Sequence, residues 1–385
     1  MLSALSDGRP AEGLPRRVLM TTDAVGGVWT YALDLAAGLS RAGIETCLAV
    51  LGPAPDADQR RAVKAVPGLA FVETGLPLDW TAPTPDLIRD AGAAVADLAH
   101  DARADLVHLN SPALAADNVF PAPVVAVAHS CVATWWAAVK HGPLPDDFTW
   151  RAAMVGEGYQ AADAVIAPSL SFAEATRAAY ALPYRPSVVR NGRRAAATPG
   201  DATPGRGASF AFTAGRLWDE GKNLGMLDRA AARLSVPVFA AGPLEGPNGT
   251  AIALEHVETL GRLTDHAVSR WLAAAPVFVS TAFYEPFGLA VLEAAQAGCP
   301  LVLSDIPTFR ELWDGAALFV DPNDPADVAG AVRHMLREPD ERRARGSAAR
   351  ERAAHYGVAV MAAGTLEVYR EAMRAELVLT KEEAA

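Results

Sequence analysis

The sequence predicts an α/β protein of two domains, each built on a parallel β-sheet with helices on both faces. A chain of 385 residues is too long for one ordinary hydrophobic core, so its length favours two domains. Short runs rich in β-branched residues alternate with longer runs of helical periodicity, and this alternation restarts after residues 190–209. Such alternation is typical of doubly wound sheets, and each half of the chain supplies one.

The first predicted domain, residues 1–190, contains five strand-like runs. They are RVLMTT from Arg17, ETCLAVL from Glu45, DLVHLN from Asp105, PVVAVAH from Pro123 and DAVIAPS from Asp163. Helical runs lie between most of them, at Thr30–Arg41, Asp86–His100 and Trp150–Gln160. Strands separated by helices in this way predict a parallel sheet.

The second predicted domain, residues 191–358, repeats this pattern after a linker rich in Gly, Pro, Ala and Arg at 190–209. Its strand-like runs are SFAFTAG from Ser209, PVFAAG from Pro237, HVETLG from His256, PVFVS from Pro276 and LVLS from Leu301. Helices are expected near Asn223–Leu234, at Asp265–Ala274 and around Glu293. From Pro325 the chain turns helical, and we expect a last helix, 359–385, to pack back on the first domain. Two such domains are expected to face a central cleft, where pockets commonly form.

Composition excludes several classes of protein. Hydrophobic residues make up 51% and charged residues 21%, as in globular proteins. A formal charge of −11 argues against binding nucleic acid through bulk electrostatics and against general attraction to anionic membranes. The N-terminus lacks the apolar core of a signal peptide, so we expect a soluble, cytoplasmic protein. Cys47, Cys131 and Cys299 have no metal-ligand spacing, which favours reduced thiols over a disulfide framework or a zinc site.

Gly26 and Gly27 lie between a predicted strand and a predicted helix in the first domain. Glycine at this point lets backbone N–H groups approach a phosphate at the positive end of the helix. The pattern is not GxGxxG, because Val28, Trp29 and Thr30 follow, so a nicotinamide-binding site is not indicated. A tight strand-to-helix turn is the alternative interpretation.

The first predicted strand of the second domain is followed by a glycine and two basic residues. Gly215 and Arg216 end the strand, and Lys222 comes six positions after Arg216. Cations at the mouth of a parallel sheet suggest an anion site, with Arg216 able to bind phosphate through two N–H groups. Solvated surface cations are the alternative.

Two glutamates flank a helix start in STAFYEPFGLAVLEAAQAGCPLVLSD, residues 280–305. Gly288 and Leu289 are placed at the N-terminus of the helix, where backbone N–H groups can bind phosphate. Glu293, one turn into the helix, can accept hydrogen bonds from the two hydroxyls of a ribose diol. Glu285 lies in the loop before the helix. On spacing alone both glutamates are ordinary surface charges, and only their place at a strand–loop–helix entry favours a site.

The sequence around the two glutamates, together with four other motifs, resembles that of a known enzyme family. YEPFGLAVLEAAQAGCPLVLSDIPTFREL closely resembles the E-x7-E signature of retaining glycosyltransferases of family 4, which have the GT-B fold of two Rossmann-like domains. GRLWDEGKN, RNG, VGGVWTYALDLAAGLSRAG and GRLTDHAVSRWLAAAPVFVS occur in the family's order, so the resemblance covers Arg17 to Tyr369. Family members usually place the lysine five residues after the arginine, whereas an extra Gly221 makes it six here.

The resemblance implies roles for particular residues. Glu293 would bind the ribose, Glu285 the hydroxyls of the donor sugar, Arg216 and Lys222 the diphosphate, and the backbone of Leu263 the base. His129 would line the sugar site, although a core histidine is its alternative interpretation. The implied catalytic residues are Glu285, His129, Arg216 and Lys222. The implied donor-binding residues are Glu293, Gly288, Leu289, Phe287, Leu263, Gly26, Gly27, Arg216 and Lys222.

The function expected from the resemblance is retaining transfer of a hexose from a nucleotide-diphosphate sugar to an acceptor hydroxyl. Two alternatives are a sugar-nucleotide epimerase on the same fold and a non-catalytic carbohydrate- or nucleotide-binding protein; a phosphorylase is disfavoured because it needs a pyridoxal-phosphate lysine and a longer chain. No DxD-type metal site is evident, since PDAD at Pro55–Asp58 resembles a solvated loop, so neither a metal nor a cofactor is expected. The acceptor is a small molecule, a glycan or a lipid-linked sugar, with membrane association weak or absent. Trp135 and Trp136 either stack on a sugar or fill the core.

Overall fold

The structure is a computed structural model that describes residues 10–140, 142–195, 209–274 and 276–383. Contacts divide the chain into two units. Unit 1 comprises Met1–Ala137, His141–Gly192 and Val358–Ala385, and unit 2 comprises Ala138–Lys140 and Arg193–Gly357. Within the described part of the chain, no helix combines the length and the hydropathy needed to cross a bilayer.

Unit 1 is built on a seven-stranded parallel sheet in the order β3-β2-β1-β4-β5-β6-β7. The strands are β1 (Arg17–Asp23), β2 (Glu45–Leu51), β3 (Leu69–Glu73), β4 (Leu106–Leu109), β5 (Val124–Val127), β6 (Ala164–Ala167) and β7 (Ser187–Val188). The order reverses between β1 and β4, and ligands of open α/β sheets bind at the carboxyl ends of the strands beside such a reversal.

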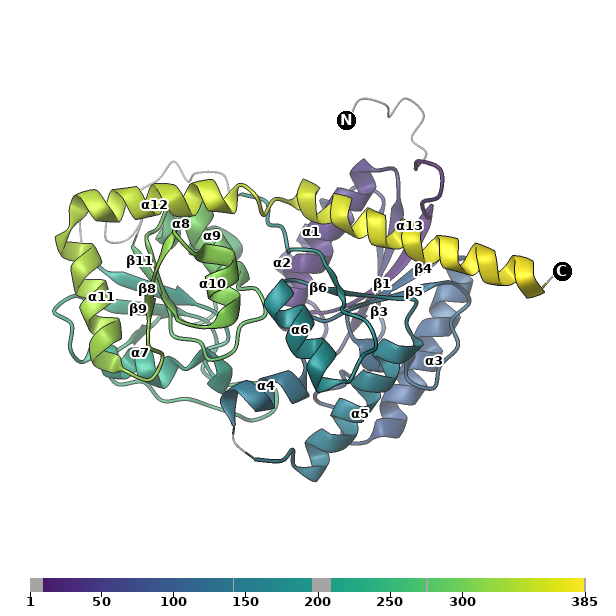
Figure 1. The fold of residues 1–385 in the computed structure, drawn as a ribbon, viewed down its shortest axis with the longest axis horizontal. Coiled ribbons are helices and arrows are strands. Elements are labelled where there is room, and N and C mark those ends of the chain that lie inside the picture. Colours follow the sequence, from purple (N-terminus) through teal and green to yellow (C-terminus); the bar gives the residue numbers. More distant parts are fainter. Residues whose placement is uncertain (1–9, 141, 196–208, 275, 384–385) are drawn as a thin grey trace. The chain divides into compact units, whose positions relative to one another are not determined.

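Helices cover this sheet, and the last helix of the chain is one of them (Figure 1). They are α1 (Gly27–Arg41), α2 (Ala57–Lys64), α3 (Pro85–Asp101), the 3-10 turn η1 (Pro112–Ala115), α4 (Val132–Val139), α5 (Asp146–Ala161), α6 (Leu170–Ala179) and α13 (Val358–Glu383). The helices α1 and α13 cross closely because Gly38 has no side chain; a Cβ there would lie 2.6 Å from the Cβ of Ala362. Tyr31 and Tyr369 from these two helices are buried in the same core cluster.

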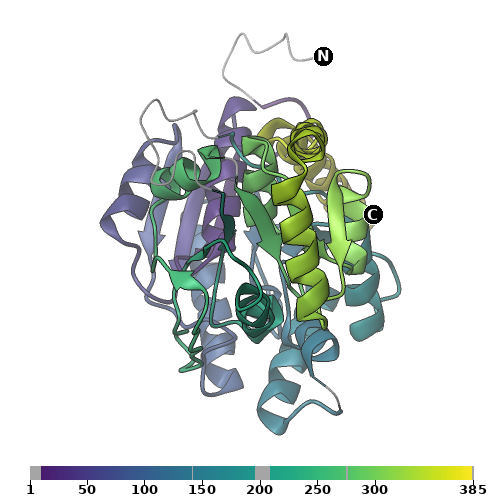
Figure 2. The same cartoon turned by 90° about the vertical axis from the view of Figure 1, so that its left-hand side faces the viewer.

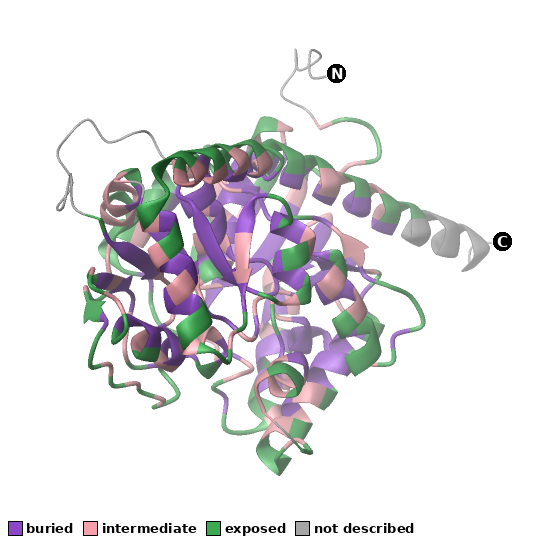
Figure 3. Cartoon of the chain, turned by 60° about the vertical axis from the view of Figure 1, so that its left-hand side comes forward, coloured by how far each residue is buried: buried purple, intermediate pink, exposed green. Residues whose placement is uncertain are grey.

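Unit 2 is built on a six-stranded parallel sheet in the order β10-β9-β8-β11-β12-β13. The strands are β8 (Ala211–Ala214), β9 (Val238–Ala241), β10 (Glu258–Thr259), β11 (Val277–Ser280), β12 (Leu301–Ser304) and β13 (Ala317–Val320). The central strands β11 and β12 are almost wholly buried, as expected for a sheet covered on both faces (Figure 3).

Two hydrophobic clusters lie on the two faces of the unit 2 sheet. One is formed with α8 (Asp265–Ala273), α9 (Leu289–Ala297), α10 (Pro307–Trp313) and α12 (Pro339–Ala353). The other is formed with α7 (Leu224–Ala231) and α11 (Pro325–Arg337), which pack together (Figures 1 and 2). This is the layering of a doubly wound fold, so the predicted α/β class with two parallel sheets is confirmed.

Some local elements differ from the prediction. The PDAD stretch is a loop only in its first half: Pro55 and Asp56 precede α2, and Ala57 and Asp58 are its first residues. Asp56 caps this helix by accepting from the N–H groups of Asp58 and Gln59, and the Gln59 side chain accepts from the N–H of Asp56. An acidic residue followed three positions later by glutamine is the capping-box signature of a helix start. The edge strand β3 was also missed, since it is short and largely exposed. Of the predicted linker, residues 196–208 lie outside the described residues.

Candidate active site

Arg216 lies where β8 ends at the carboxyl edge of the unit 2 sheet. Gly215, with φ of 151°, turns the chain directly after the strand. The guanidinium of Arg216 donates from Nη2 to Asp219 Oδ2 over 2.8 Å and lies 5.7 Å from the ring centroid of Trp218. Asp219 is buried and also accepts from the N–H of Gly221. A buried carboxylate thus orients a half-exposed cation at the strand end.

The extra residue Gly221 joins Lys222 to the loop that carries Glu285. The carbonyl of Gly221, in the 3-10 turn η2 (Glu220–Lys222), accepts from the N–H groups of Phe283 at 2.9 Å and Tyr284 at 3.2 Å. Lys222 Nζ then lies 2.5 Å from Glu285 Oε2, with side-chain exposures of 21% and 15%. The longer spacing in GRLWDEGKN therefore provides a backbone anchor, and the lysine still reaches the glutamate.

The N-terminus of α9 lies at the same edge. Gly288 precedes the helix with φ of 93°, and a Cβ there would be 3.3 Å from Glu285, Val291 and Phe309, so glycine suits both the backbone and the packing. Helix N-termini present N–H groups that have no partner within the helix, and their dipole favours anions. Arg216, Lys222 and Glu285 line one small pocket together with residues of the first turn of α9.

Glu293 lies one turn into α9, and its partner was not predicted. Arg193 Nε donates to Glu293 Oε1 over 2.7 Å, and Arg193 Nη2 lies 3.0 Å from Asp265 Oδ2. Asp265 is the first residue of α8, directly after the Leu263–Thr264 segment. Arg193 directly follows the RNG motif of residues 190–192, and this second arginine beside the motif was the available signal.

Phe287 has a different position from the other candidate donor-binding residues. Its side chain is buried in the hydrophobic cluster and packs edge-on against Tyr356, with ring centroids 5.7 Å apart. Leu263 is partly buried against the same cluster. Any contact of Phe287 with a donor must therefore come from its backbone.

His129 lies just beyond β5 at the carboxyl edge of the unit 1 sheet. Its Nε2 is 2.7 Å from Asn110 Oδ1, and the Asn110 amide donates to the carbonyl of Thr21 in β1. The hydrogen bond to Thr21 fixes the orientation of the Asn110 amide, so its oxygen faces His129 and can only accept. His129 Nε2 is therefore the protonated nitrogen, and Nδ1 is the acceptor. Burial, followed by the influence of His108, lowers the pKa of His129 to about 3, so its imidazole is neutral.

A buried cluster of aromatic and polar residues supports His129. The ring of Tyr31 meets His129 edge-on, with centroids 4.5 Å apart. His108 lies in β4 between two tyrosine hydroxyls. Its Nδ1 is 2.8 Å from the hydroxyl of Tyr369, and its Nε2 is 3.5 Å from the hydroxyl of Tyr31. Burial lowers the pKa of His108 to about 3, which makes this cluster uncharged. No separate signal pointed to His108, because a histidine within a predicted strand resembles any other core residue.

Gly26 and Gly27 form the predicted strand-to-helix turn. Gly26 caps α1 without a side-chain hydrogen bond, and Gly27 is the first helical residue. Before the turn, the side chain of Asp23 accepts from the N–H of Val25 over 2.8 Å. The two glycines are therefore placed at the carboxyl end of β1, beside the reversal in strand order.

Trp135 and Trp136 are both half-buried in α4. The Trp136 ring packs edge-on against Phe148, and its indole N–H donates to the carbonyl of Gly142 over 3.1 Å. Trp136 is therefore held by contacts of its own, and neither tryptophan is a fully buried core residue.

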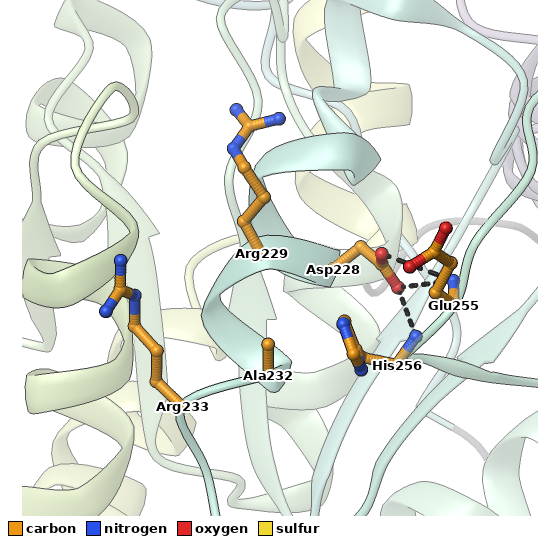
Figure 4. Close-up of a pocket in the computed structure, with 6 residues that line it drawn as sticks. All are labelled: Asp228, Arg229, Ala232, Arg233, Glu255 and His256. Carbon is orange, nitrogen blue, oxygen red and sulfur yellow. Dashed lines mark hydrogen bonds between the residues drawn. The ribbon is translucent and has the colours of Figure 1, made fainter.

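A larger pocket, of about 370 Å³, lies elsewhere on unit 2 (Figure 4). Asp228, Arg229, Arg233, Glu255 and His256 line it, but the Asp228 carboxylate accepts from the backbone N–H groups of residues 255–257. Helix α7 runs back from the carboxyl edge and the 255–257 loop precedes β10, so this pocket belongs to the opposite edge of the sheet. Its carboxylate anchors a loop, and the pocket is not part of the candidate site.

Cys47, Cys131 and Cys299 are thiols, as predicted. In the ranges that the structure describes, no group of three or more His, Cys, Asp or Glu side chains is arranged to hold a metal ion. The expected independence of metals stays a prediction, which a chelator can test.

Comparison with known proteins agrees with this geometry. Residues 25–195 match the profile described as Glycosyltransferase Family 4, and residues 250–352 match that of Glycosyl transferases group 1. The chain is 31% identical over 271 residues to the alpha-maltose-1-phosphate synthase of Mycolicibacterium smegmatis, covering 58% of this chain and 69% of that protein. The chain belongs to glycosyltransferase family 4. As a family 4 enzyme it is a glycosyltransferase of the GT-B type.

Other relatives of this glycosyltransferase match over smaller parts. The D-inositol 3-phosphate glycosyltransferase of Streptomyces bingchenggensis is 30% identical over 162 residues, which cover 38% of this chain and about a third (34%) of that relative. Among solved structures, the sucrose-phosphate synthase of Thermosynechococcus elongatus superposes with a TM-score of 0.76 at 18% identity, covering 94% of this chain and 100% of that one. The Anabaena protein HepE, solved with UDP-glucose, gives a TM-score of 0.70 at 19% identity, covering 91% and 98%. Both structural likenesses show the GT-B fold.

Proposed function

We propose that this glycosyltransferase transfers a hexose, with retention of anomeric configuration, from a nucleotide-diphosphate sugar bound to unit 2. The observation that carries the proposal is one pocket at the carboxyl edge of the unit 2 sheet. Arg216, Lys222 and Glu285 line it beside the N-terminus of α9, and Glu293 follows one turn later. The two cations and the helix N–H groups suit a diphosphate, Glu285 suits the hydroxyls of a sugar, and Glu293 suits a ribose diol.

The hard step in such a transfer is departure of the nucleoside diphosphate. Negative charge grows on the diphosphate as its bond to the sugar carbon breaks, and preorganised positive groups stabilise that charge. Asp219 holds the Arg216 guanidinium in place, so part of the ordering cost is met before the donor binds. Lys222 contributes a point charge, and the first N–H groups of α9 contribute oriented dipoles.

The carboxylates act on hydroxyl groups. Glu285, in the loop before α9, accepts from hydroxyls of the donor sugar while its other contact, Lys222, holds it in position. Glu293 accepts from the ribose diol, and backbone groups of Leu263 contact the base. The position of Leu263 directly before Thr264, which caps α8 by accepting from Ala267 N–H, supports a fixed backbone there.

Unit 1 is assigned the acceptor. His129 supports this role as a neutral group with one donor and one acceptor nitrogen, held by Asn110 and Tyr31. A neutral imidazole can form hydrogen bonds with a sugar hydroxyl. Because it carries no negative charge, it does not compete with the diphosphate for Arg216 and Lys222. In the proposed step the acceptor oxygen bonds to the sugar carbon, the carbon–phosphate oxygen bond breaks, and the acceptor proton passes to the departing diphosphate.

The donor and acceptor are open to a direct test. HepE binds UDP-glucose and the Mycolicibacterium relative is named for α-maltose 1-phosphate, which suggests a glucose donor and a sugar or sugar-phosphate acceptor as the first trial. We would incubate the enzyme with ADP-, GDP- and UDP-glucose and with GDP-mannose, in EDTA, against an acceptor pool. Release of nucleoside diphosphate is expected, together with a product that is heavier than its acceptor by the mass of one hexosyl group.

Two controls separate the alternatives. Donor incubated alone would give an isomerised nucleotide sugar if the protein were an epimerase. Binding of nucleoside diphosphate without any turnover would favour a non-catalytic binding protein. A strict need for magnesium or manganese would contradict the assignment of the diphosphate to Arg216, Lys222 and α9.

A further inference from the structure

Arg193 is held in a defined place by its own backbone. Its N–H donates to the carbonyl of Tyr356 over 3.1 Å, and its carbonyl accepts from Gln296 Nε2 over 3.0 Å. Gln296 lies in α9, three residues after Glu293. The side chain of Arg193 is only 15% exposed. The guanidinium is therefore anchored against α9 and is not an extended surface arginine.

The guanidinium joins two segments to which separate parts of a nucleoside are assigned. Its Nε–H meets Glu293 Oε1 at 2.7 Å, and its Nη2 meets Asp265 Oδ2 at 3.0 Å. Glu293 is 27% exposed, whereas Asp265 is 83% exposed, so the contact with Glu293 is the stronger of the two. Asp265 begins α8 immediately after the Leu263–Thr264 segment.

We propose that Arg193 is a positioning residue for the donor nucleoside, fixing the Glu293 carboxylate for the ribose diol and tying it to the base-binding segment. The inference rests on the proposed function, since it assigns Glu293 to the ribose. A glutamate on a helix samples several rotamers, and a charge-assisted hydrogen bond to one oxygen selects among them. The cation also offsets the negative charge of Glu293, which would otherwise repel a diphosphate donor.

The readout is the preference for ribose over 2′-deoxyribose. A residue that only stabilises the fold would weaken binding of both forms alike, whereas a residue that positions Glu293 acts on the hydroxyl contacts. We would measure Kd by calorimetry for ADP, GDP and UDP, and then for the 2′-deoxy form of the tightest binder. Arg193→Gln should lower the ribose preference by about tenfold, the scale of one hydrogen bond to a charged group.

Three variants complete the design. Arg194→Gln, a change at the exposed neighbouring arginine, is the matched control and should keep the preference. Arg193→Lys keeps a cation with N–H donors but not the rigid, planar placement of the guanidinium, so an intermediate preference is expected. This variant is measured in parallel in case Arg193→Gln does not fold. In a Glu293→Gln background, Arg193→Gln should have no further effect on the preference, because it acts through that carboxylate.

The outcomes distinguish the two proposals. If the wild-type protein binds none of the three nucleoside diphosphates, the proposed function fails. If the wild type prefers ribose and folded Arg193→Gln keeps that preference in full, the role of Arg193 is overturned while the proposed function stands. A wild type without any ribose preference overturns both the ribose assignment of Glu293 and the role of Arg193.

Discussion

At the carboxyl edge of the unit 2 sheet the candidate side chains are charged and paired, whereas at that of unit 1 they are neutral and joined by aromatic contacts. In unit 2, Lys222 is paired with Glu285 and Arg193 with Glu293. In unit 1, His129 and His108 are uncharged because burial lowers the pKa of each to about 3. The two sheets share one architecture, so the difference comes from the side chains that follow the strands.

The charges at each edge decide which ligands that edge can stabilise. A lysine ammonium has three N–H donors, so Lys222 can contact a diphosphate while its pairing with Glu285 keeps that carboxylate oriented toward hydroxyl groups. A neutral cluster cannot neutralise a diphosphate, but it offers oriented hydrogen bonds to hydroxyl groups. Substitutions at the charged edge should therefore change turnover and donor affinity, while substitutions of His108 and Tyr369, which lie behind His129 in the neutral cluster, should mainly change stability.

The largest expected effect concerns Arg216 and Lys222. Substitution of either residue by Ala should lower turnover more than it weakens donor binding, because the leaving group carries more negative charge in the transition state than in the bound donor. By analogy with loss of one oxyanion-hole donor, turnover should fall about 100- to 1,000-fold for Arg216→Ala and less for Lys222→Ala. Turnover at saturating donor and Kd for the nucleoside diphosphate are to be measured separately.

The control for this pair is Arg337→Ala, at an exposed arginine in the last turn of α11. Thermal melts of each variant establish that it is folded. Near-normal turnover of a folded Arg216→Ala enzyme would remove the diphosphate role from this residue and, with it, the physical contrast between the two edges.

Glu293→Gln should have the next largest effect. The amide keeps the size of the side chain but replaces one acceptor oxygen with a donor group, so affinity for the donor should fall by about 1 to 3 kcal/mol. Calorimetric titration with the nucleoside diphosphate measures this change directly. An unaltered Kd would exclude Glu293 from the ribose.

Acid should destabilise the neutral cluster. Because the pKa of buried His108 falls from 6.5 to about 3, the unfolded chain binds a proton below pH 6.5 that the folded chain does not. The free energy of unfolding should therefore decrease as the pH falls from about 6.5 toward 3, by about 1.4 kcal/mol per pH unit from this residue. Urea unfolding at pH 7, 6 and 5 should show a flatter dependence for His108→Gln, with His355→Gln at an exposed site as the control. Equal pH dependence of both variants would contradict a neutral buried His108.

Tyr369→Phe should have the smallest effect. It removes the hydroxyl that lies 2.8 Å from His108 Nδ1 and leaves a buried ring nitrogen without that partner. Unfolding free energy should fall by about 1 to 3 kcal/mol, with turnover of the folded enzyme close to that of the wild type. A tenfold loss of turnover at unchanged stability would show that the neutral cluster has more than a supporting role.

Much of this fold was predictable because strand and helix periodicities differ and alternate clearly along the chain. The strand–Gly–helix entry at Gly288 and the place of Glu293 one turn later also followed from local pattern, and the structure confirms both positions. The pairing of Arg193 with Glu293 did not follow, because it joins residues 100 positions apart. The same holds for Tyr369 and His108, whose contact depends on how α13 crosses α1. Local signals predict elements, whereas the partners of charged and buried polar groups depend on tertiary packing.

The most direct test of a retaining nucleotide-sugar transferase is a proton NMR time course of donor and acceptor with the wild-type enzyme in EDTA. We predict that the donor anomeric signal decays while nucleoside diphosphate and one new anomeric signal appear in equal amounts, and that the product has the anomeric configuration of the donor. An inverted product, an isomerised donor without product, or a donor that is bound and never consumed would contradict retaining transfer by this enzyme.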